Sequence, residues 1–174
     1  MTSHPRAEDG DVTDVDPASY RQAMGRFASG VAVATSRLRG QDVAMTVDSL
    51  TSISLDPVLL LVSLHAEARV LEGVQDGGPL GISVLTVRQR RIAAWLAEHG
   101  RPLHGQLTNV PHSPGPVTGA ALVDGALAAF ECRPWSVQEV GDHFLVLGQV
   151  VGLQAFPTEE PALVHYRGRF EELR

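Results

Sequence analysis

The sequence contains no lysine, because all 14 of its basic residues are arginine. Enzymes that form a Schiff base, enzymes that anchor pyridoxal phosphate and Walker-type nucleotide hydrolases are therefore excluded, since each depends on a lysine amine. If the protein binds a phosphate group, the positive charge must come from arginine, whose planar fork of N–H groups matches phosphate oxygens.

Cysteine is nearly absent as well, and Cys132 is the only thiol. A single cysteine cannot form an intrachain disulfide or build a cysteine-rich metal site, which favours a cytoplasmic location. The histidines show no spacing typical of a zinc site, so we expect no structural metal. No apolar run approaches the roughly 18 residues that a membrane span needs, so we expect no membrane partner.

Excess charge is confined to the N-terminus. Residues 1–16 hold five acidic side chains and one arginine, and we expect them to form a disordered acidic tail. Residues 17–174 carry 13 basic and 15 acidic side chains, a near balance that gives no electrostatic footprint for nucleic acid. Their number fits one globular domain.

Turn residues and apolar patterns predict many short strands and few helices. Asp16 and Pro17 predict a capped helix that ends near Gly30, and Thr86 predicts the cap of a second helix that ends at Gly100. The Pro- and Gly-rich residues 101–119 predict a long loop, of the kind that often serves as a lid or a partner surface. Strands are predicted at residues 31–35, 43–47, 58–62, 80–85, 126–135, 144–153 and 162–166.

Strands that do not alternate regularly with helices argue against a doubly wound parallel sheet. We predict a mostly β fold, an antiparallel split β-barrel of Greek-key type with two or three flanking helices. Such barrels bind ligands at their rims or between subunits, and a second copy often covers an exposed face. We therefore expect a homodimer.

Two segments carry candidate chemistry. Residues 45–54 place five hydroxyls just after a strand, where they either hold carbonyl or phosphate oxygens of a ligand or satisfy their own loop backbone. The run Gly141-Asp142-His143 predicts a turn that presents His143 at a strand end, either to a ligand or simply at the strand edge. Spacing alone does not decide between these readings.

Four segments in chain order are GRFASGV at residues 25–31, MTVDSLTSISLDP at 45–57, GDH at 141–143 and HYRGRF at 165–170. Together they resemble the flavin reductase family with the FMN-binding split-barrel fold, the reductase components of two-component flavin monooxygenases. The resemblance runs from about Tyr20 to Phe170.

This resemblance implies a homodimer in which NADH or NADPH reduces FMN or FAD, and the reduced flavin passes to a separate flavin-dependent monooxygenase in a bacterial secondary-metabolite or catabolic pathway. It implies that His143 is the catalytic histidine that orients the nicotinamide. The flavin would contact Met45, Thr46, Val47, Asp48, Ser49, Ser52, Ser63, Leu64 and Ser83. Its phosphate would face Ala68 and Arg69, with Arg167 and Arg169 as the next candidate cations.

Four positions depart from the family's pattern. Asp48 and Ser83 stand where Asn is frequent, and the phosphate segment has Ala68 and Val70 where hydroxyls are usual. A carboxylate at position 48 would repel a flavin phosphate unless a cation offsets it. These departures leave two alternatives open, which are a flavin-free barrel that guides cyclisation or rearrangement of a small natural product and a non-catalytic flavin-binding or interaction protein.

Overall fold

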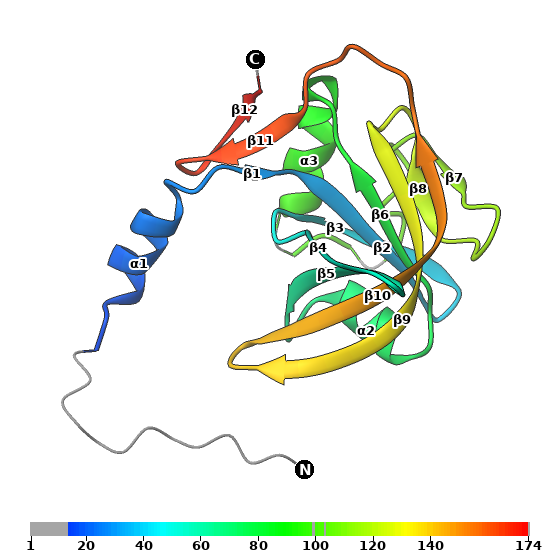
Figure 1. The fold of residues 1–174 in the computed structure, drawn as a ribbon, viewed down its shortest axis with the longest axis horizontal. Helices are drawn as coiled ribbons and strands as arrows, with labels where there is room; N and C mark the ends of the chain where they lie inside the picture. Colours follow the sequence, from blue (N-terminus) through cyan, green and yellow to red (C-terminus); the bar gives the residue numbers. More distant parts are fainter. Residues whose placement is uncertain (1–13, 99, 103, 174) are drawn as a thin grey trace.

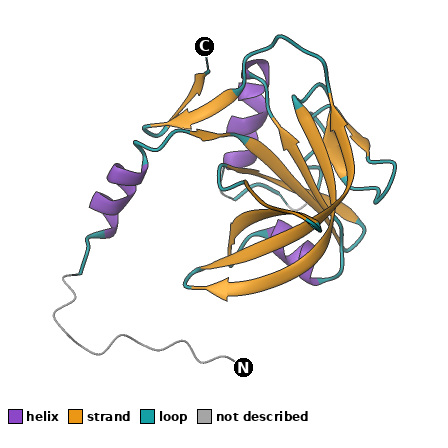
Figure 2. Cartoon of the chain, viewed as in Figure 1, coloured by secondary structure: helices purple, strands orange, loops and turns teal. Residues whose placement is uncertain are grey.

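The computed structural model describes residues 14–98, 100–102 and 104–173, so residues 1–13 of the expected tail lie outside the described part. Strands dominate the molecule, and the helices lie at its periphery (Figures 1 and 2). The helices are α1 (Pro17–Met24), α2 (Arg69–Gln75) and α3 (Arg90–Ala97), with a 3₁₀ turn, η1 (Val87–Gln89), directly before α3. The strands are β1 (Ser29–Gly30), β2 (Ala32–Leu38), β3 (Gln41–Val47), β4 (Thr51–Leu55), β5 (Val58–His65), β6 (Leu80–Val84), β7 (His112–Pro114), β8 (Ala121–Val123), β9 (Ala128–Val140), β10 (His143–Ala155), β11 (Leu163–Tyr166) and β12 (Arg169–Glu172).

The main sheet has seven strands in the order β3-β2-β6-β9-β10-β5-β4, and every neighbouring pair is antiparallel. A small sheet, β1-β11-β12, and the pair β7-β8 complete the strand pairing of the described residues. The predicted mostly β, antiparallel fold with flanking helices is confirmed. Within the described residues, no helix is long and apolar enough to cross a membrane.

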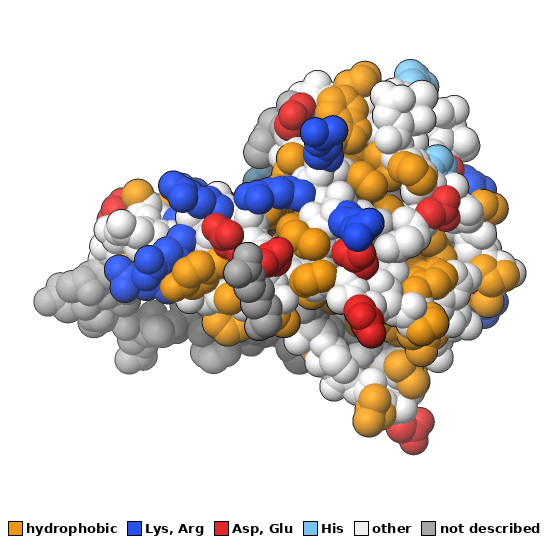
Figure 3. Space-filling view, turned by 90° about the horizontal axis from the view of Figure 1, so that it is seen from above, with side chains coloured by type: hydrophobic (Ala, Val, Ile, Leu, Met, Phe, Trp, Pro, Cys, Tyr) orange, Lys and Arg blue, Asp and Glu red, His pale blue; other side chains and the backbone are white. Residues whose placement is uncertain are grey.

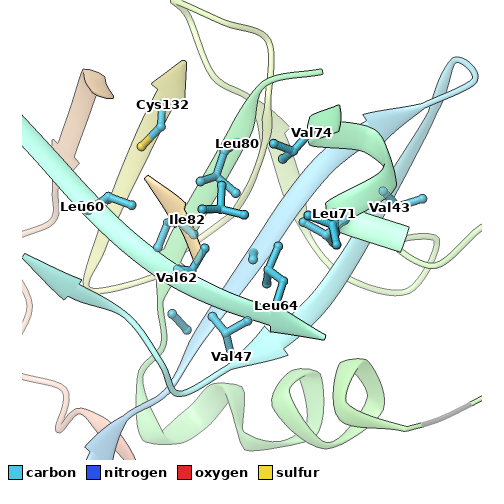
Figure 4. Packing of buried hydrophobic residues seen from close by; sticks show 14 of the residues in the cluster. Val43, Val47, Leu60, Val62, Leu64, Leu71, Val74, Leu80, Ile82 and Cys132 are labelled. Atoms are coloured by element: carbon cyan, nitrogen blue, oxygen red, sulfur yellow. The ribbon is translucent and has the colours of Figure 1, made fainter. Parts of the chain in front are cut away.

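Helix α2 covers one end of the main sheet and was not predicted as a helix. It buries Val70, Leu71 and Val74 in a core that also contains Leu64 from β5 (Figure 4). Each such side chain contributes about 1.5–3 kcal/mol when it is fully buried. The close approach of α2 to β2 depends on Gly73, where a Cβ atom would lie 2.8 Å from the Ser36 hydroxyl. A seven-residue helix with a central glycine gives little helical signal in the sequence.

The first predicted helix forms with its expected cap, since the Asp16 carboxylate accepts from the Ser19 amide at 2.9 Å, but the helix ends at Met24 and not near Gly30. The expected end is wrong because Ser29 must be extended to pair with His165 of β11. In the second predicted helix Thr86 does cap η1, in a reciprocal pair with Gln89.

Residues 101–119 form less of an open loop than the composition suggests. Residues 112–114 within them form β7. The side-chain oxygen of Gln106 accepts from the Ala44 amide at 2.9 Å, and the backbone carbonyl of Gln106 accepts from the Trp95 indole at 3.0 Å. Leu107 and Val110 are buried against β3 and α3. The segment is therefore packed onto the body, and its first residues contribute to the pocket described next.

Candidate functional site

A pocket of about 490 Å³ lies where β3, the end of β5, the start of α2 and the end of α3 meet. Three stretches distant in sequence line it, namely residues 44–46, residues 65 and 67–70, and residues 96–98, 100, 101 and 106. Four of the predicted flavin contacts, Met45, Thr46, Ala68 and Arg69, are thereby brought together. The Thr46 hydroxyl donates a hydrogen bond to the Ala93 carbonyl at 2.7 Å, so its proton is already used within the protein.

Two arginines give this pocket its charge. Arg69 donates from Nη1 to the Arg101 carbonyl at 2.8 Å. The Arg101 guanidinium reaches back across the pocket wall to the carbonyls of Glu98 (2.7 Å), Ala44 (2.9 Å) and Trp95 (3.2 Å). Burial and, after it, the nearby positive charge of Arg69 lower the pKa of Arg101, and Glu98 offsets part of this effect.

Arg101 was not among the residues expected from the sequence. It follows Gly100 at the start of the proline-rich segment, and nothing in its spacing connects it to Arg69. Only the fold brings Arg101, which follows α3, beside Arg69, which begins α2. The sequence offered only a general signal for Arg101: because there is no lysine, any phosphate-binding cation must be an arginine.

The hydroxyl-rich segment after β3 splits into two parts. Residues 51–55 form the edge strand β4 and not a loop, and Ser52 is exposed on it. Ser49 lies beside β5 just beyond the point where the pairing of β4 with β5 ends. Its hydroxyl donates to the Ser63 carbonyl (3.0 Å) and accepts from the Ser63 amide (3.1 Å). Ser49 therefore completes the hydrogen bonding of β5 in place of a neighbouring strand.

Asp48 meets a residue from the far end of the chain. Its carboxylate lies 2.9 Å from Nδ1 of His165 on β11, and both side chains are partly exposed. The side chain that faces this carboxylate is thus a histidine and not an arginine.

The remaining predicted flavin contacts lie outside the pocket. Val47 and Leu64 are buried in the core, and Ser83 is fully buried with its hydroxyl accepting from the Val123 amide at 2.9 Å. Arg167 and Arg169 border hollows on another part of the surface, and neither lines the pocket beside Arg69.

The largest of these hollows, about 560 Å³, lies between α1 and the turn after β11. Arg21, Arg26 and Arg167 line it, and Figure 3 shows arginine side chains gathered over this arm of the molecule. It contains none of the hydroxyl-rich segment, and His143 does not line it.

His143 begins β10 opposite His65, which ends β5. The two imidazole rings are 5.3 Å apart in an edge-to-face arrangement, and His65 lines the pocket. Nδ1 of His143 lies 2.7 Å from the Asp142 carboxylate, and this hydrogen bond is the main reason why the pKa of Asp142 is lowered. The predicted histidine therefore stands at the rim of the arginine pocket, joined to it through His65.

The structure thus combines an antiparallel sheet, a pocket that two arginines line and a histidine at a neighbouring strand end. The family of flavin reductase like domains matches residues 24–174. The chain belongs to the flavin reductase family.

Three known proteins show what the chain is similar to. It is 38% identical over 165 residues to the NADH-dependent FMN reductase AsuE2 of Streptomyces nodosus subsp. asukaensis, covering 93% of this chain and 88% of that one. It is 29% identical over 157 residues to the reductase subunit HsaB of a flavin-dependent monooxygenase of Mycobacterium tuberculosis, covering 90% and 82%. The solved structure of the Streptomyces globisporus NADH:FAD oxidoreductase SgcE6 in complex with NAD and FAD fragments matches with a TM-score of 0.84 at 30% identity, covering 97% and 98%.

Proposed function

We propose that this protein is an NAD(P)H:flavin oxidoreductase that reduces FMN or FAD and delivers the reduced flavin to a separate monooxygenase. Membership of the flavin reductase family supports the reaction, and the relatives named as an NADH-dependent FMN reductase and as a monooxygenase reductase subunit support the donor, the acceptor and the type of partner. These relatives also support FMN or FAD as the acceptor and a nicotinamide as the donor.

The observation that carries the proposal is the pocket beside Arg69. A flavin nucleotide has an apolar ring at one end and a phosphate at the other, and this pocket combines apolar wall residues such as Met45 and Leu96 with two guanidinium groups. Arg101 also has a buried Nε with no partner among the described residues, a donor that a phosphate oxygen would satisfy. The donor set therefore fits the phosphate end of a flavin.

Flavin, when bound, supplies the acceptor for the hydride of the reduced nicotinamide. The protein's own task is to hold two planar molecules in contact, because correct placement lowers the barrier without proton transfer by side chains. Arg69 fixes the phosphate end. His143 fixes the nicotinamide at the rim: the carboxylate of Asp142 can only accept, so Nδ1 of His143 carries the proton and Nε2 is left to hydrogen-bond the carboxamide.

The test is a binding and turnover experiment on the purified chain. FMN and FAD are titrated with the protein while flavin fluorescence is followed, and each flavin is then supplied with NADH or NADPH while nicotinamide oxidation is recorded. We expect flavin binding and rapid oxidation of at least one nicotinamide. Absence of oxidation in all four combinations would contradict the proposal.

A homodimer of split barrels is part of the same proposal. Helix α1 buries none of its residues: its Tyr20 is 60% exposed, and Phe27, shortly after the helix, is 71% exposed. Elsewhere, Trp135 of the long β9–β10 hairpin is 56% exposed, and Leu55 of the edge strand β4 is 84% exposed. Both α1 and the hairpin project from the body in Figure 1. Large exposed apolar residues on projecting elements are typical of surfaces that a partner subunit covers.

Light scattering or sedimentation of the wild-type chain should give twice the monomer mass of 18.6 kDa. Replacing Trp135 by Asp should shift the equilibrium towards monomer, whereas replacing the exposed Gln138 of the same strand by Asp should not. A wild-type protein that remains monomeric at high concentration would contradict this part of the proposal.

A further inference from the structure

Among the described residues, two buried polar side-chain atoms have no hydrogen-bond partner: the hydroxyl oxygen of Ser36 and Nε of Arg101. They differ in what surrounds them. The Ser36 hydroxyl is enclosed between β2 and α2, where Gly73 and Gly78 come so close that a Cβ atom on either would lie 2.8 Å from it. Arg101, by contrast, lines the pocket. A buried donor without an acceptor is costly, and only the one at the pocket can gain a partner from a ligand.

The guanidinium of Arg101 is already fixed in place. Three hydrogen bonds, from Nη1 to Trp95 and Glu98 and from Nη2 to Ala44, tie it to the end of α3 and to β3. An arginine has five N–H donors, so these bonds leave donor capacity on the group that includes the buried Nε–H. A side chain held in this way loses little conformational entropy when it binds a ligand.

Glu98 offsets the positive charge of this corner only in part. Neither Arg69 nor Arg101 forms an ion pair within the described part of the chain, although Arg69 donates to the carbonyl of Arg101. Glu67 and Glu98 also line the pocket, but both are exposed to solvent. An anion placed between the two guanidinium groups would relieve their mutual repulsion.

We propose that Arg101 is a second phosphate-binding residue, which donates its Nε–H to a phosphate oxygen of the flavin and, through its backbone carbonyl, holds Arg69 in position to bind the same phosphate. This inference rests on the proposed function, because it deepens the description of the same pocket. The ligand group is one that FMN and FAD share and riboflavin lacks. Arg101 is thus a determinant of selectivity for flavin nucleotides over the free vitamin.

The experiment compares the affinity of FMN with that of riboflavin, measured by fluorescence quenching without any nicotinamide. The wild-type chain should bind FMN at least about tenfold more tightly than riboflavin, because charge-assisted hydrogen bonds are the strong ones. In Arg101→Gln this preference should fall by about tenfold through loss of FMN affinity, with riboflavin affinity unchanged. Arg101→Lys, which keeps the charge but has no Nε–H, should lose most of the preference too. Arg39→Gln, in the exposed β2–β3 turn, is the control with the same change of charge.

Equal affinity of the wild-type chain for FMN and riboflavin would overturn the inference without any variant, and so it stays testable if Arg101→Gln fails to fold. Equal loss of both affinities in Arg101→Gln would overturn it too, because the residue would then act only through α3 and β3. Inorganic phosphate should compete with FMN and not with riboflavin; competition with both or with neither counts against the site. Failure of the proposed function has a different signature, which is absence of nicotinamide oxidation whatever the ratio of the two affinities.

Discussion

Nδ1 of His165, nine residues from the C-terminus, lies 2.9 Å from the carboxylate of Asp48, which follows β3. The pair joins the small β1-β11-β12 sheet to the hydroxyl-rich segment that the flavin is proposed to contact. A carboxylate near a bound phosphate is unfavourable unless a hydrogen-bond donor or cation offsets it, and the ring of His165 supplies the donor, and also the charge when it is protonated. The acidic residue at position 48 is therefore compatible with flavin binding.

A double-mutant cycle tests this relationship. Replacing His165 by Ala should weaken FMN binding by about threefold to tenfold, the range of a partly screened charge interaction, while stability falls by less than about 1 kcal/mol. In an Asp48→Asn background the same replacement should have little effect on FMN affinity, because a neutral amide needs no counter-charge. Equal effects of His165→Ala in both backgrounds would show that the two residues are not coupled.

Replacement of His143 tests whether this histidine binds the nicotinamide. In His143→Ala the KM for NADH or NADPH should rise by about tenfold, whereas the affinity for flavin should change little, because the lost hydrogen bond serves the nicotinamide. Steady-state kinetics and flavin titration separate the two effects. His104→Ala, an exposed histidine that does not line the pocket, is the control. If His143→Ala leaves the nicotinamide dependence unchanged, the histidine has only a structural role.

The lowered pKa of Glu131 makes the stability of the protein depend on pH. This carboxylate is buried in β9; burial raises its pKa, but hydrogen bonds from Thr118 and the Val117 amide outweigh that effect and hold the pKa below its ordinary value. A carboxyl with a lowered pKa in the folded state stabilises the protein above its unfolded pKa, and this contribution is lost as pH falls through the folded value.

The measurement is urea unfolding of the wild type and Glu131→Gln at several pH values. At neutral pH the variant should be less stable by about 1–3 kcal/mol, because an amide N–H₂ replaces an acceptor among donors. The difference should begin to shrink below about pH 4.3, the ordinary pKa of a glutamate in the unfolded chain, and it should be lost as pH falls through the lower pKa of the folded state. Glu139→Gln, exposed on the same strand, should show no such trend. A difference independent of pH would refute the assignment.

Gly115 and Gly152 leave the space that Glu131 occupies. A Cβ atom on Gly115 would lie 2.3 Å from Cδ of Glu131, so Gly115→Ala should destabilise the chain by about 1–3 kcal/mol. Gly30→Ala is the matched control, since a Cβ there meets nothing within 4 Å, and its effect should be within about 0.5 kcal/mol. Thermal or urea unfolding gives both values. Similar stability of the two variants would show that the packing around Glu131 can adjust.

Local signals in the sequence predicted much of the fold. The Asp16 cap, the Thr86 cap and the strand at residues 58–62 all depend on short-range chemistry, and all three are present in the structure. Helix α2 was missed because its stability comes from packing of Leu71 and Val74 against the sheet and not from its own propensity.

The candidate site was predictable only where neighbours in the chain are also neighbours in space. Ala68 with Arg69, and Met45 with Thr46, are such pairs, and they line the pocket. Arg101 and the partner of Asp48 were not foreseen, since both contacts depend on chain crossings that no local pattern records.

The most direct test of the central claim is anaerobic mixing of the protein with flavin and reduced nicotinamide, followed by absorbance. If the protein is a flavin reductase, the flavin loses its yellow colour in step with oxidation of the nicotinamide, one flavin for each nicotinamide, because a hydride carries both electrons. The rate should scale with protein concentration. Flavin that keeps its colour with FMN and with FAD, in the presence of NADH and of NADPH, would contradict the claim.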